Sequence, residues 1–238
     1  GGTNRRFEIV PSSINDSESI YESAPIPGTG LTYTYRSDGS GDSSNTTGFF
    51  FLFKQGTLES QTFSVDTAIT NYVKSFSTSN INDTDVWFYK LDQFGQVSEE
   101  WTKIPSFTGN NAIYNSLAKS ERNSFNVVTK VNDAIDLVFG DGNFSNLPLG
   151  DFRTYYRTSD NSKYAIQPAD MQSVVLNLPY TDNNGALQTL TMTMGLRSSV
   201  YNSSATESNA SIKEKAGQVY YSQNRMITAE DYQVVPLS

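Results

Sequence analysis

Short runs of alternating apolar and polar residues, divided by turn-forming residues, recur up to about residue 197 and constrain the fold more than any other feature. The clearest pair is Val174–Tyr180 and Leu187–Leu196, separated by Thr181 to Gly185. In the second run leucine and methionine alternate with threonine, which is the period of two expected of a strand with one face in water. Asn and Gly favour a turn between the two runs. The pair predicts a β-hairpin, and the recurrence of such runs favours a mainly β fold.

Further strands are predicted by the same criteria. They are Phe7–Val10, Leu31–Tyr35, Phe49–Phe53, Thr57–Val65, Val86–Leu91, Gln96–Ile104, Phe125–Val131, Ile135–Phe139 and Phe152–Arg157. Because Phe49–Phe53 is a run of large apolar residues, we expect that strand to be covered on both faces. Lys54 to Gly56 should turn it into a hairpin with Thr57–Val65.

After residue 197 the pattern changes to one typical of helices. Ser204 and Glu207 have the spacing of a capping box. The apolar residues that follow at helical spacing are Ile212, Ala216, Val219 and Tyr220. A second helix start is predicted at Thr228 to Asp231, where the acidic residues also suit the helix dipole.

These patterns predict a mainly β domain over residues 1–197, antiparallel and sandwich-like, followed by a short helical connector over residues 198–238. An alternative division into two β subdomains would place the break near residues 105–124. The chain opens with Gly1-Gly2-Thr3 and ends soon after the second helix start. We therefore expect a portion of a longer protein, in which the connector leads to another domain.

The composition excludes several kinds of chemistry. Histidine and cysteine are both absent, which removes Ser-His-Asp and Cys-His catalysis, disulfides and the usual zinc sites. Hydrophobic residues make up 37% of the chain and aromatic residues 13%, enough to build a core. The net charge of −8 repels phosphate groups, so neither nucleic acid nor an anionic membrane is expected as a partner.

The candidate carboxylate sites do not fit known chemistry. Asp38 to Asp42 resembles the start of a calcium loop, but the sixth position is Ser43 instead of glycine. Glu99 and Glu100 are adjacent, so on a strand they point to opposite faces and cannot converge across a cleft as a glycosidase requires. We expect no enzyme activity, no catalytic residue, no metal site and no cofactor.

Aromatic residues on the predicted strands leave a binding site open as an alternative. Those that could form a platform for stacking sugars are Trp87, Trp101, Tyr155 and Tyr156. Aromatic side chains in strands lie more often in the core or at a protein interface. An exposed row would favour a carbohydrate- or receptor-binding module, whereas burial would favour a scaffold.

One segment between two predicted strands, residues 139–150, has the unusual sequence FGDGNFSNLPLG. It is not a phosphate-binding P-loop, because no Gly-Lys-Ser/Thr follows. We expect Gly140 and Gly142 to adopt positive φ angles, and Asp141 to accept hydrogen bonds from amides of the loop. The residues of this predicted structural motif are Phe139, Gly140, Asp141, Gly142, Pro148 and Gly150.

This segment resembles the FGDG signature of the baseplate-J-like proteins of contractile-tailed phages, with Ser145 where glycine is common. Residues 205–232 resemble the C-terminal pattern of the same family, and Gly48 to Leu58 resembles its T-even branch, the wedge proteins called gene product six. The residues that carry the C-terminal resemblance are Arg225, Thr228, Glu230, Asp231 and Tyr232.

The resemblance implies a structural subunit of the virion tail baseplate, assembled in the host cytoplasm. It implies contacts with further copies of the chain, as a dimer or ring, and with other wedge proteins. No catalytic residues are known in that family, and no small-molecule substrate is expected. A carbohydrate- or receptor-binding β module of a phage tail is the alternative. A tail-associated glycan hydrolase is a third possibility, which would need two carboxylates on neighbouring strands.

Overall fold

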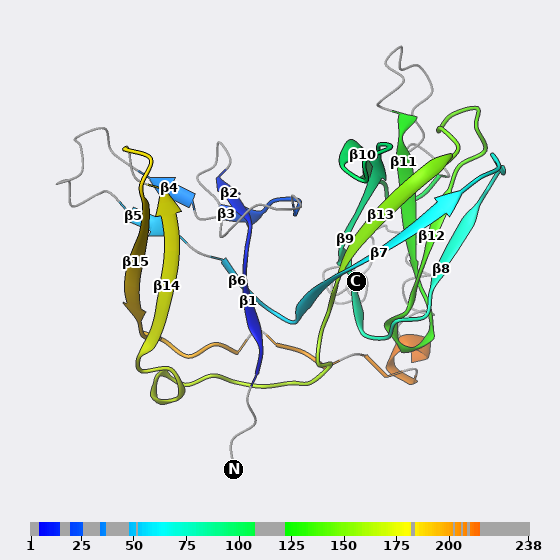
Figure 1. Cartoon of the computed structure of the whole chain (residues 1–238). Coiled ribbons are helices and arrows are strands. Elements are labelled where there is room, and N and C mark those ends of the chain that lie inside the picture. Colours follow the sequence, from blue (N-terminus) through cyan, green and yellow to red (C-terminus); the bar gives the residue numbers. More distant parts are fainter. Residues whose placement is uncertain are drawn as a thin grey trace. The chain divides into compact units, whose positions relative to one another are not determined.

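The computed structural model describes residues 5–14, 20–25, 34–36, 48–50, 52–107, 122–181, 184–201, 203–205, 207–208 and 210–214 (Figure 1). The chain divides into two compact units, Gly1–Asp160 and Asn161–Ser238. Strands predominate, and the α-helical residues of the described part are 210–214. The prediction of a mainly β fold with a short C-terminal helical segment is confirmed. The boundary proposed at residue 197 stays a prediction.

The largest element of the first unit is a seven-stranded sheet in the order β7-β13-β9-β10-β11-β12-β8. Its strands are β7 (Thr57–Val65), β8 (Val73–Phe76), β9 (Ile81–Leu91), β10 (Val97–Lys103), β11 (Ser124–Thr129), β12 (Ile135–Phe139) and β13 (Gly150–Thr158). All neighbouring strands are antiparallel except β10 and β11, which run parallel. A 3-10 turn at Val131–Asp133 joins β11 to β12.

The sheet curls until its two edge strands face each other. Phe63 on β7 and Phe76 on β8 belong to opposite edges of the strand order, yet their ring centroids are 6.3 Å apart. Lys74 on β8 places its Nζ 4.8 Å from the centroid of the Phe63 ring. Figure 1 shows the curled sheet. The buried hydrophobic side chains cluster on its inner face.

Phe88 on β9 lies at the centre of that core and is fully buried. Its ring stacks on Phe152 of β13 with centroids 4.8 Å apart, and contacts Phe139 of β12 at 5.2 Å. Trp101 of β10 meets the same ring edge-on at 5.6 Å. β13 and β10 are the direct neighbours of β9, whereas β12 is not, so the contact between Phe88 and Phe139 crosses the inside of the curl and stabilises it.

Three small sheets precede the large one, and they correct one prediction. They pair β1 (Phe7–Val10) with β6 (Leu52–Gln55), β2 (Ser12–Ile14) with β3 (Ile20–Glu22), and β4 (Thr34–Arg36) with β5 (Gly48–Phe50). The predicted hairpin between Phe49–Phe53 and Thr57–Val65 is therefore wrong: β6 pairs with β1, and β7 forms its ladder with β13. Phe53 is 41% exposed, so coverage of that run on both faces is also wrong.

The physical reason for that error is the length of the competing ladder. β7 pairs with β13 from Thr57 to Val65, whereas β6 is four residues long. Gly56, with φ of +122°, redirects the chain between the two strands, and a Cβ there would lie 2.3 Å from the carbonyl oxygen of Thr158. The turn was recognised from the sequence, but the partner of each strand was not.

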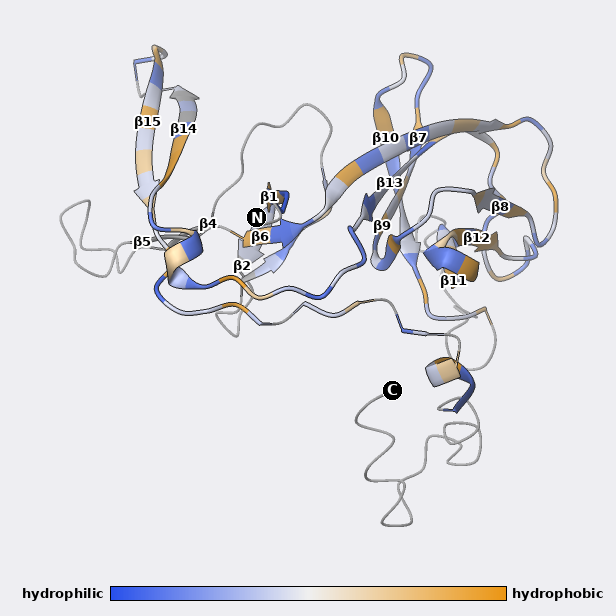
Figure 2. Cartoon of the chain, turned by 90° about the horizontal axis from the view of Figure 1, so that it is seen from below, coloured by the Kyte–Doolittle hydropathy of each residue, from blue (hydrophilic) through white to orange (hydrophobic). Residues whose placement is uncertain are grey.

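The second unit contains the hairpin formed by β14 (Val174–Thr181) and β15 (Leu187–Met194), as predicted. Figure 2 shows apolar residues alternating with polar ones along β15. A 3-10 turn at Pro168–Asp170 precedes the hairpin. The predicted cap at Ser204 is wrong: Ser208 accepts a hydrogen bond from the amide of Ser211 at 3.2 Å, which is the cap geometry, and the helical residues begin at 210.

Candidate functional site

The FGDG loop, residues 140–149, crosses from one half of the curled sheet to the other. It connects the end of β12 at Phe139 to the start of β13 at Gly150, and three strands separate β12 from β13 in the sheet order. Phe139 is buried in the core, and Gly150 has a φ of +110°. The carbonyl of Gly140 accepts a hydrogen bond from the amide of Asn71 at 2.9 Å, which joins this loop to the one between β7 and β8.

The two glycines of the motif are required for different reasons. Gly142 has a φ of +87°, so the prediction of a positive angle is confirmed there. Gly140 is not among the residues with positive φ, so the same prediction is wrong for that position. A Cβ on Gly140 would lie 1.7 Å from Ser145 Oγ, so the absence of a side chain permits a close approach within the loop.

Asp141 has the role expected from the sequence. Its Oδ1 accepts hydrogen bonds from the amides of Asn143 at 2.9 Å and Phe144 at 3.3 Å. The hydrogen bond from the Asn143 amide, with smaller contributions from the Asn143 side chain and the Phe144 amide, holds the pKa of Asp141 below its usual range. The ionised carboxylate is thus used to fix the loop backbone.

A residue outside the motif, Arg122, also holds the loop. Its guanidinium donates to the carbonyl oxygens of Gly142, at 3.2 Å, and Asn143. Its own carbonyl accepts from the amide of Asn146 at 2.8 Å, and the Asn146 side chain donates to Asn123 Oδ1 at 2.7 Å. Sequence reasoning missed Arg122, because nothing in the local pattern around it indicates a partner so far along the chain.

The loop buries some of its side chains and exposes two large apolar ones. Pro148 is fully buried, and Ser145 is buried with no hydrogen-bond partner for its Oγ among the described residues. Phe144 and Leu149 are 45% and 48% exposed. The loop therefore presents an exposed apolar surface on a hydrogen-bonded backbone.

The C-terminal part of the predicted motif lies outside the described residues. Its members are Arg225, Thr228, Glu230, Asp231 and Tyr232.

A second feature, which the sequence did not indicate, is a charged cluster drawn from five strands of the first unit. Its members are Glu8 (β1), Glu22 (β3), Lys54 (β6), Asp85 (β9) and Arg157 (β13), here called the Arg157 cluster. The Arg157 guanidinium is buried and donates to Asp85 at 3.2 Å, Glu8 at 3.1 Å and Glu22 at 2.8 Å.

Lys54 supplies the second cation of the Arg157 cluster. Its Nζ donates to Asp85 Oδ1 at 2.7 Å and also contacts Glu22. Burial lowers the pKa of Lys54, but the hydrogen bonds to Asp85 and Glu22 outweigh it and raise the pKa above its usual value. Two cations thus balance most of the charge of three carboxylates, and the cluster fastens β1, β3 and β6 to the large sheet.

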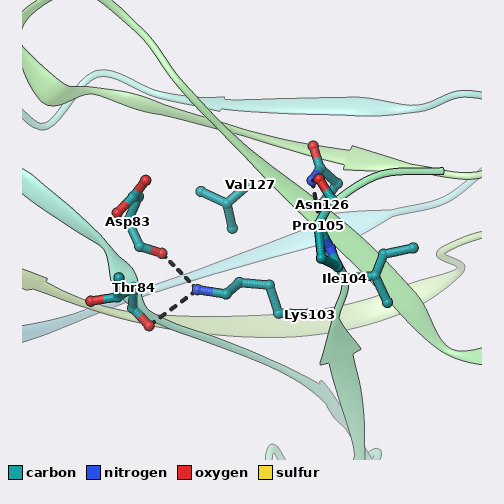
Figure 3. A pocket seen from close by; sticks show the side chains of 7 residues that line it. All are labelled: Asp83, Thr84, Lys103, Ile104, Pro105, Asn126 and Val127. Atoms are coloured by element: carbon teal, nitrogen blue, oxygen red, sulfur yellow. Dashed lines mark hydrogen bonds between the residues drawn. The ribbon is translucent and has the colours of Figure 1, made fainter. Parts of the chain in front are cut away.

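The pocket shown in Figure 3 lies between the end of β10 and the neighbouring strands, with a volume of about 230 Å³. It is lined by Asp83, Thr84, Lys103, Ile104, Pro105, Asn126 and Val127. Lys103 donates to the carbonyl oxygens of Asp83 at 2.8 Å and Thr84 at 3.1 Å. Burial lowers the pKa of Lys103, against the opposing effect of Asp83 and Asp85. The ammonium group holds backbone of β9, which is a structural role.

The four aromatic residues considered as a sugar platform do not share a face. Trp101 and Tyr156 are buried in the core. Trp87 and Tyr155 are half-buried and directly opposite each other on β9 and β13, facing away from that core. Tyr89, on the same outer face, is buried and donates from its hydroxyl to the carbonyl oxygen of Pro25 at 3.1 Å.

In the part of the chain that the structure describes, no three acidic residues form a group that could bind a metal ion. Glu99 and Glu100 face Lys90 and Tyr89 in the β9 ladder, as neighbours on opposite faces of β10. Within the same residues, no helix is long and apolar enough to cross a membrane.

We expect Gly140→Ala to lower the free energy of unfolding by about 1–3 kcal/mol, the usual range for overpacking. The added Cβ would lie 1.7 Å from Ser145 Oγ and 2.9 Å from Ser145 Cβ. Ser145→Gly removes both atoms, so the double variant should regain most of that loss. Urea denaturation of the parent, both single variants and the double variant measures the coupling. Strictly additive losses would show that the close approach is not the cause.

Comparison with known proteins assigns the chain to a family without assigning an activity. No curated protein and no solved structure matches the chain. One family model, described as a domain of unknown function (DUF8360), matches residues 1–199, a range that contains the curled sheet, the FGDG loop and the β14–β15 hairpin. The chain therefore belongs to the DUF8360 family.

Proposed function

We propose that this chain is a structural subunit, or a portion of one, of the tail baseplate wedge of a contractile-tailed phage. It acts through protein–protein contacts with further copies of itself and with other wedge proteins, and it catalyses no reaction. The family to which the chain belongs leaves this role open. The resemblance of the FGDG loop and of residues 205–232 to baseplate-J-like proteins is what suggests it.

The observation that carries the proposal is how the FGDG loop uses its residues. Gly142 supplies a positive φ angle, Gly140 permits close packing, and Asp141 binds amides of its own loop. All three support one fixed backbone path across the sheet, and none directs a polar group toward a ligand. Such a loop suits a rigid module whose outer surface must match its neighbours in an assembly.

The apolar side chains that the loop presents outward support the same role. Phe144 and Leu149 are large and exposed, and hydrogen bonds to Asp141 and Arg122 hold the backbone at and just before Phe144. Exposed aromatic and aliphatic side chains on a rigid element are typical anchors of protein interfaces. Trp87 is half-buried and Trp101 is buried in the core. The alternative of a sugar-binding module, which needs a row of exposed aromatic rings, is therefore less well supported than the baseplate role.

Immunogold labelling of virions tests the proposal. Particles of the phage that carries this gene would be purified, probed with antibodies against the whole chain, and imaged by negative-stain electron microscopy. We expect the chain in immunoblots of purified particles and gold at the tail end distal to the head. Pre-immune serum provides the control. Absence of the chain from intact and from detergent-disrupted particles would refute the baseplate role.

A further inference from the structure

Both strands of the β14–β15 hairpin have an outer edge that is unpaired among the described residues and free of charge. In the strand order, β15 has a neighbour on one side only among the described residues, namely β14. Between Asp170 and Arg197 the chain has a single charged residue, Asp182, and it belongs to neither strand. Natural sheets usually protect an open edge with charged residues, proline or a bulge. β15 has none of these along Leu187–Met194.

The two edges of the hairpin differ in one respect that selects β15. β14 contains Pro179, which has no amide hydrogen and cannot donate along a ladder. β15 contains no proline, so every residue whose backbone faces away from β14 can donate as well as accept. Strand addition at this hairpin is therefore favoured along β15 and disfavoured along β14.

Most apolar side chains of the hairpin lie on one face, which the described part of the chain leaves largely open, while Val175 and Leu187 lie on the other. Val174 pairs with Met194, and Leu176 pairs with Met192, so these four side chains share a face with Leu190. Val174 and Leu190 are exposed, and Met192 and Met194 are half-buried. A two-stranded sheet is marginally stable in water, whereas three or more strands with an apolar face can be stable.

We propose that β15 of one chain pairs antiparallel with β15 of a second copy about a two-fold axis at Thr191, which joins the two hairpins into one four-stranded sheet. This pairing names a self-association surface for the proposed assembly role. Its function in the particle rests on that role, but the pairing itself can occur without it. An isologous contact of this kind closes on itself and needs one surface patch only.

The sequence of β15 is complementary to itself in this register. A two-fold axis at Thr191 places Leu190 opposite Met192 twice on the apolar face, and Thr189 opposite Thr193 twice on the polar face. Thr191 then faces its own copy. Because the chain carries a net charge of −8, two copies repel wherever their acidic surfaces meet. A contact strand without charge avoids that repulsion, which favours a second copy as the occupant.

Single-cysteine variants test this register, because the parent chain contains no cysteine. Directly paired residues of an antiparallel ladder have Cα atoms about 4.5–5.5 Å apart, within disulfide range. We expect Thr191→Cys to form a disulfide-linked dimer in high yield on mild oxidation. Thr193→Cys alone should not, since its two copies would lie about 13 Å apart along the strands. A mixture of Thr189→Cys and Thr193→Cys should give the mixed dimer.

A charge variant provides an independent measurement by sedimentation velocity of the otherwise unmodified chain. Thr191→Lys places two ammonium groups opposite each other at the axis, so we expect its dissociation constant to rise about tenfold or more. Asn177→Lys is the matched control. Asn177 is paired with Thr191 on β14, and both variants remove the same 2.9 Å hydrogen bond between these side chains. The control lysine lies one strand further from the axis and should leave association nearly unchanged.

Two results would overturn the proposed pairing. One is a monomeric parent chain at every concentration tested. The other is equal cross-linking of Thr191→Cys and Thr193→Cys, which would indicate random collision. Neither result bears on whether the chain is found in virions, so failure of this surface and failure of the baseplate role are distinguishable.

Discussion

Replacing Arg157 with methionine should lower the free energy of unfolding by about 3–5 kcal/mol, the range for removing one partner of a buried ionic group. The Arg157 side chain is 3% exposed and donates to three carboxylates, those of Glu8, Glu22 and Asp85. Without the guanidinium, Lys54 alone would face Glu22 and Asp85, and only the exposed Arg6 would face Glu8. Buried carboxylates with too little positive charge near them are costly. Methionine fills much of the same volume, so the loss reports charge more than packing.

Arg153→Met is the control for this substitution. Arg153 lies on the same strand, β13, but is half-exposed and makes one long hydrogen bond, 3.4 Å, to the carbonyl oxygen of Gly95. We expect it to cost about 0.5 kcal/mol or less. Urea denaturation followed by tryptophan fluorescence measures both. Equal effects of the two substitutions would mean that the Arg157 cluster does not fasten the small sheets to the large one.

Phe88→Ala should have a comparable effect, a loss of about 3–5 kcal/mol, because it opens a cavity at the centre of the core. The Phe88 ring contacts Phe152, Phe139 and Trp101, which come from three other strands. Since these strands lie on different parts of the curled sheet, the cavity would weaken the contacts that hold the curl closed. Near-ultraviolet circular dichroism should report the loss of aromatic packing in the same variant.

Phe94→Ala is the matched control, because it removes the same side chain from an exposed site. Phe94 lies in the turn between β9 and β10 and is 77% exposed. Surface substitutions usually change stability by about 0.5 kcal/mol or less. A loss for Phe88→Ala as small as that for Phe94→Ala in urea denaturation would show that the aromatic cluster is not the stabilising centre of this fold.

Local sequence patterns predicted most strands of the large sheet and the β14–β15 hairpin, but missed the short strands β2, β3 and β8. The alternation of Leu187–Leu196 predicted β15. Such patterns succeed because side chains of a strand point to opposite faces in turn, so a half-buried strand shows its period in its own residues. The role of Asp141 was also predictable from the local sequence, because its backbone hydrogen-bond donors lie within three residues of it.

Strand pairing was harder to predict, because it depends on competition between distant segments. β7 could pair with the preceding run or with β13, and the longer ladder with β13 prevailed. Gly140 shows the same limit within the motif. A side chain at position 140 would meet Ser145, whereas the backbone angles of Gly140 do not require glycine. The sequence motif does not show which of these two reasons applies.

The sequence by itself determined the mainly β class, the β14–β15 hairpin and the backbone function of Asp141, because each depends on residues close together in the chain. The tertiary structure alone decided the curl of the sheet, the role of Arg122 and the Arg157 cluster. The members of that cluster are as far apart as Glu8 and Arg157. Their burial as ions is stable only when partners from distant strands meet, and no local pattern of charge specifies such a meeting.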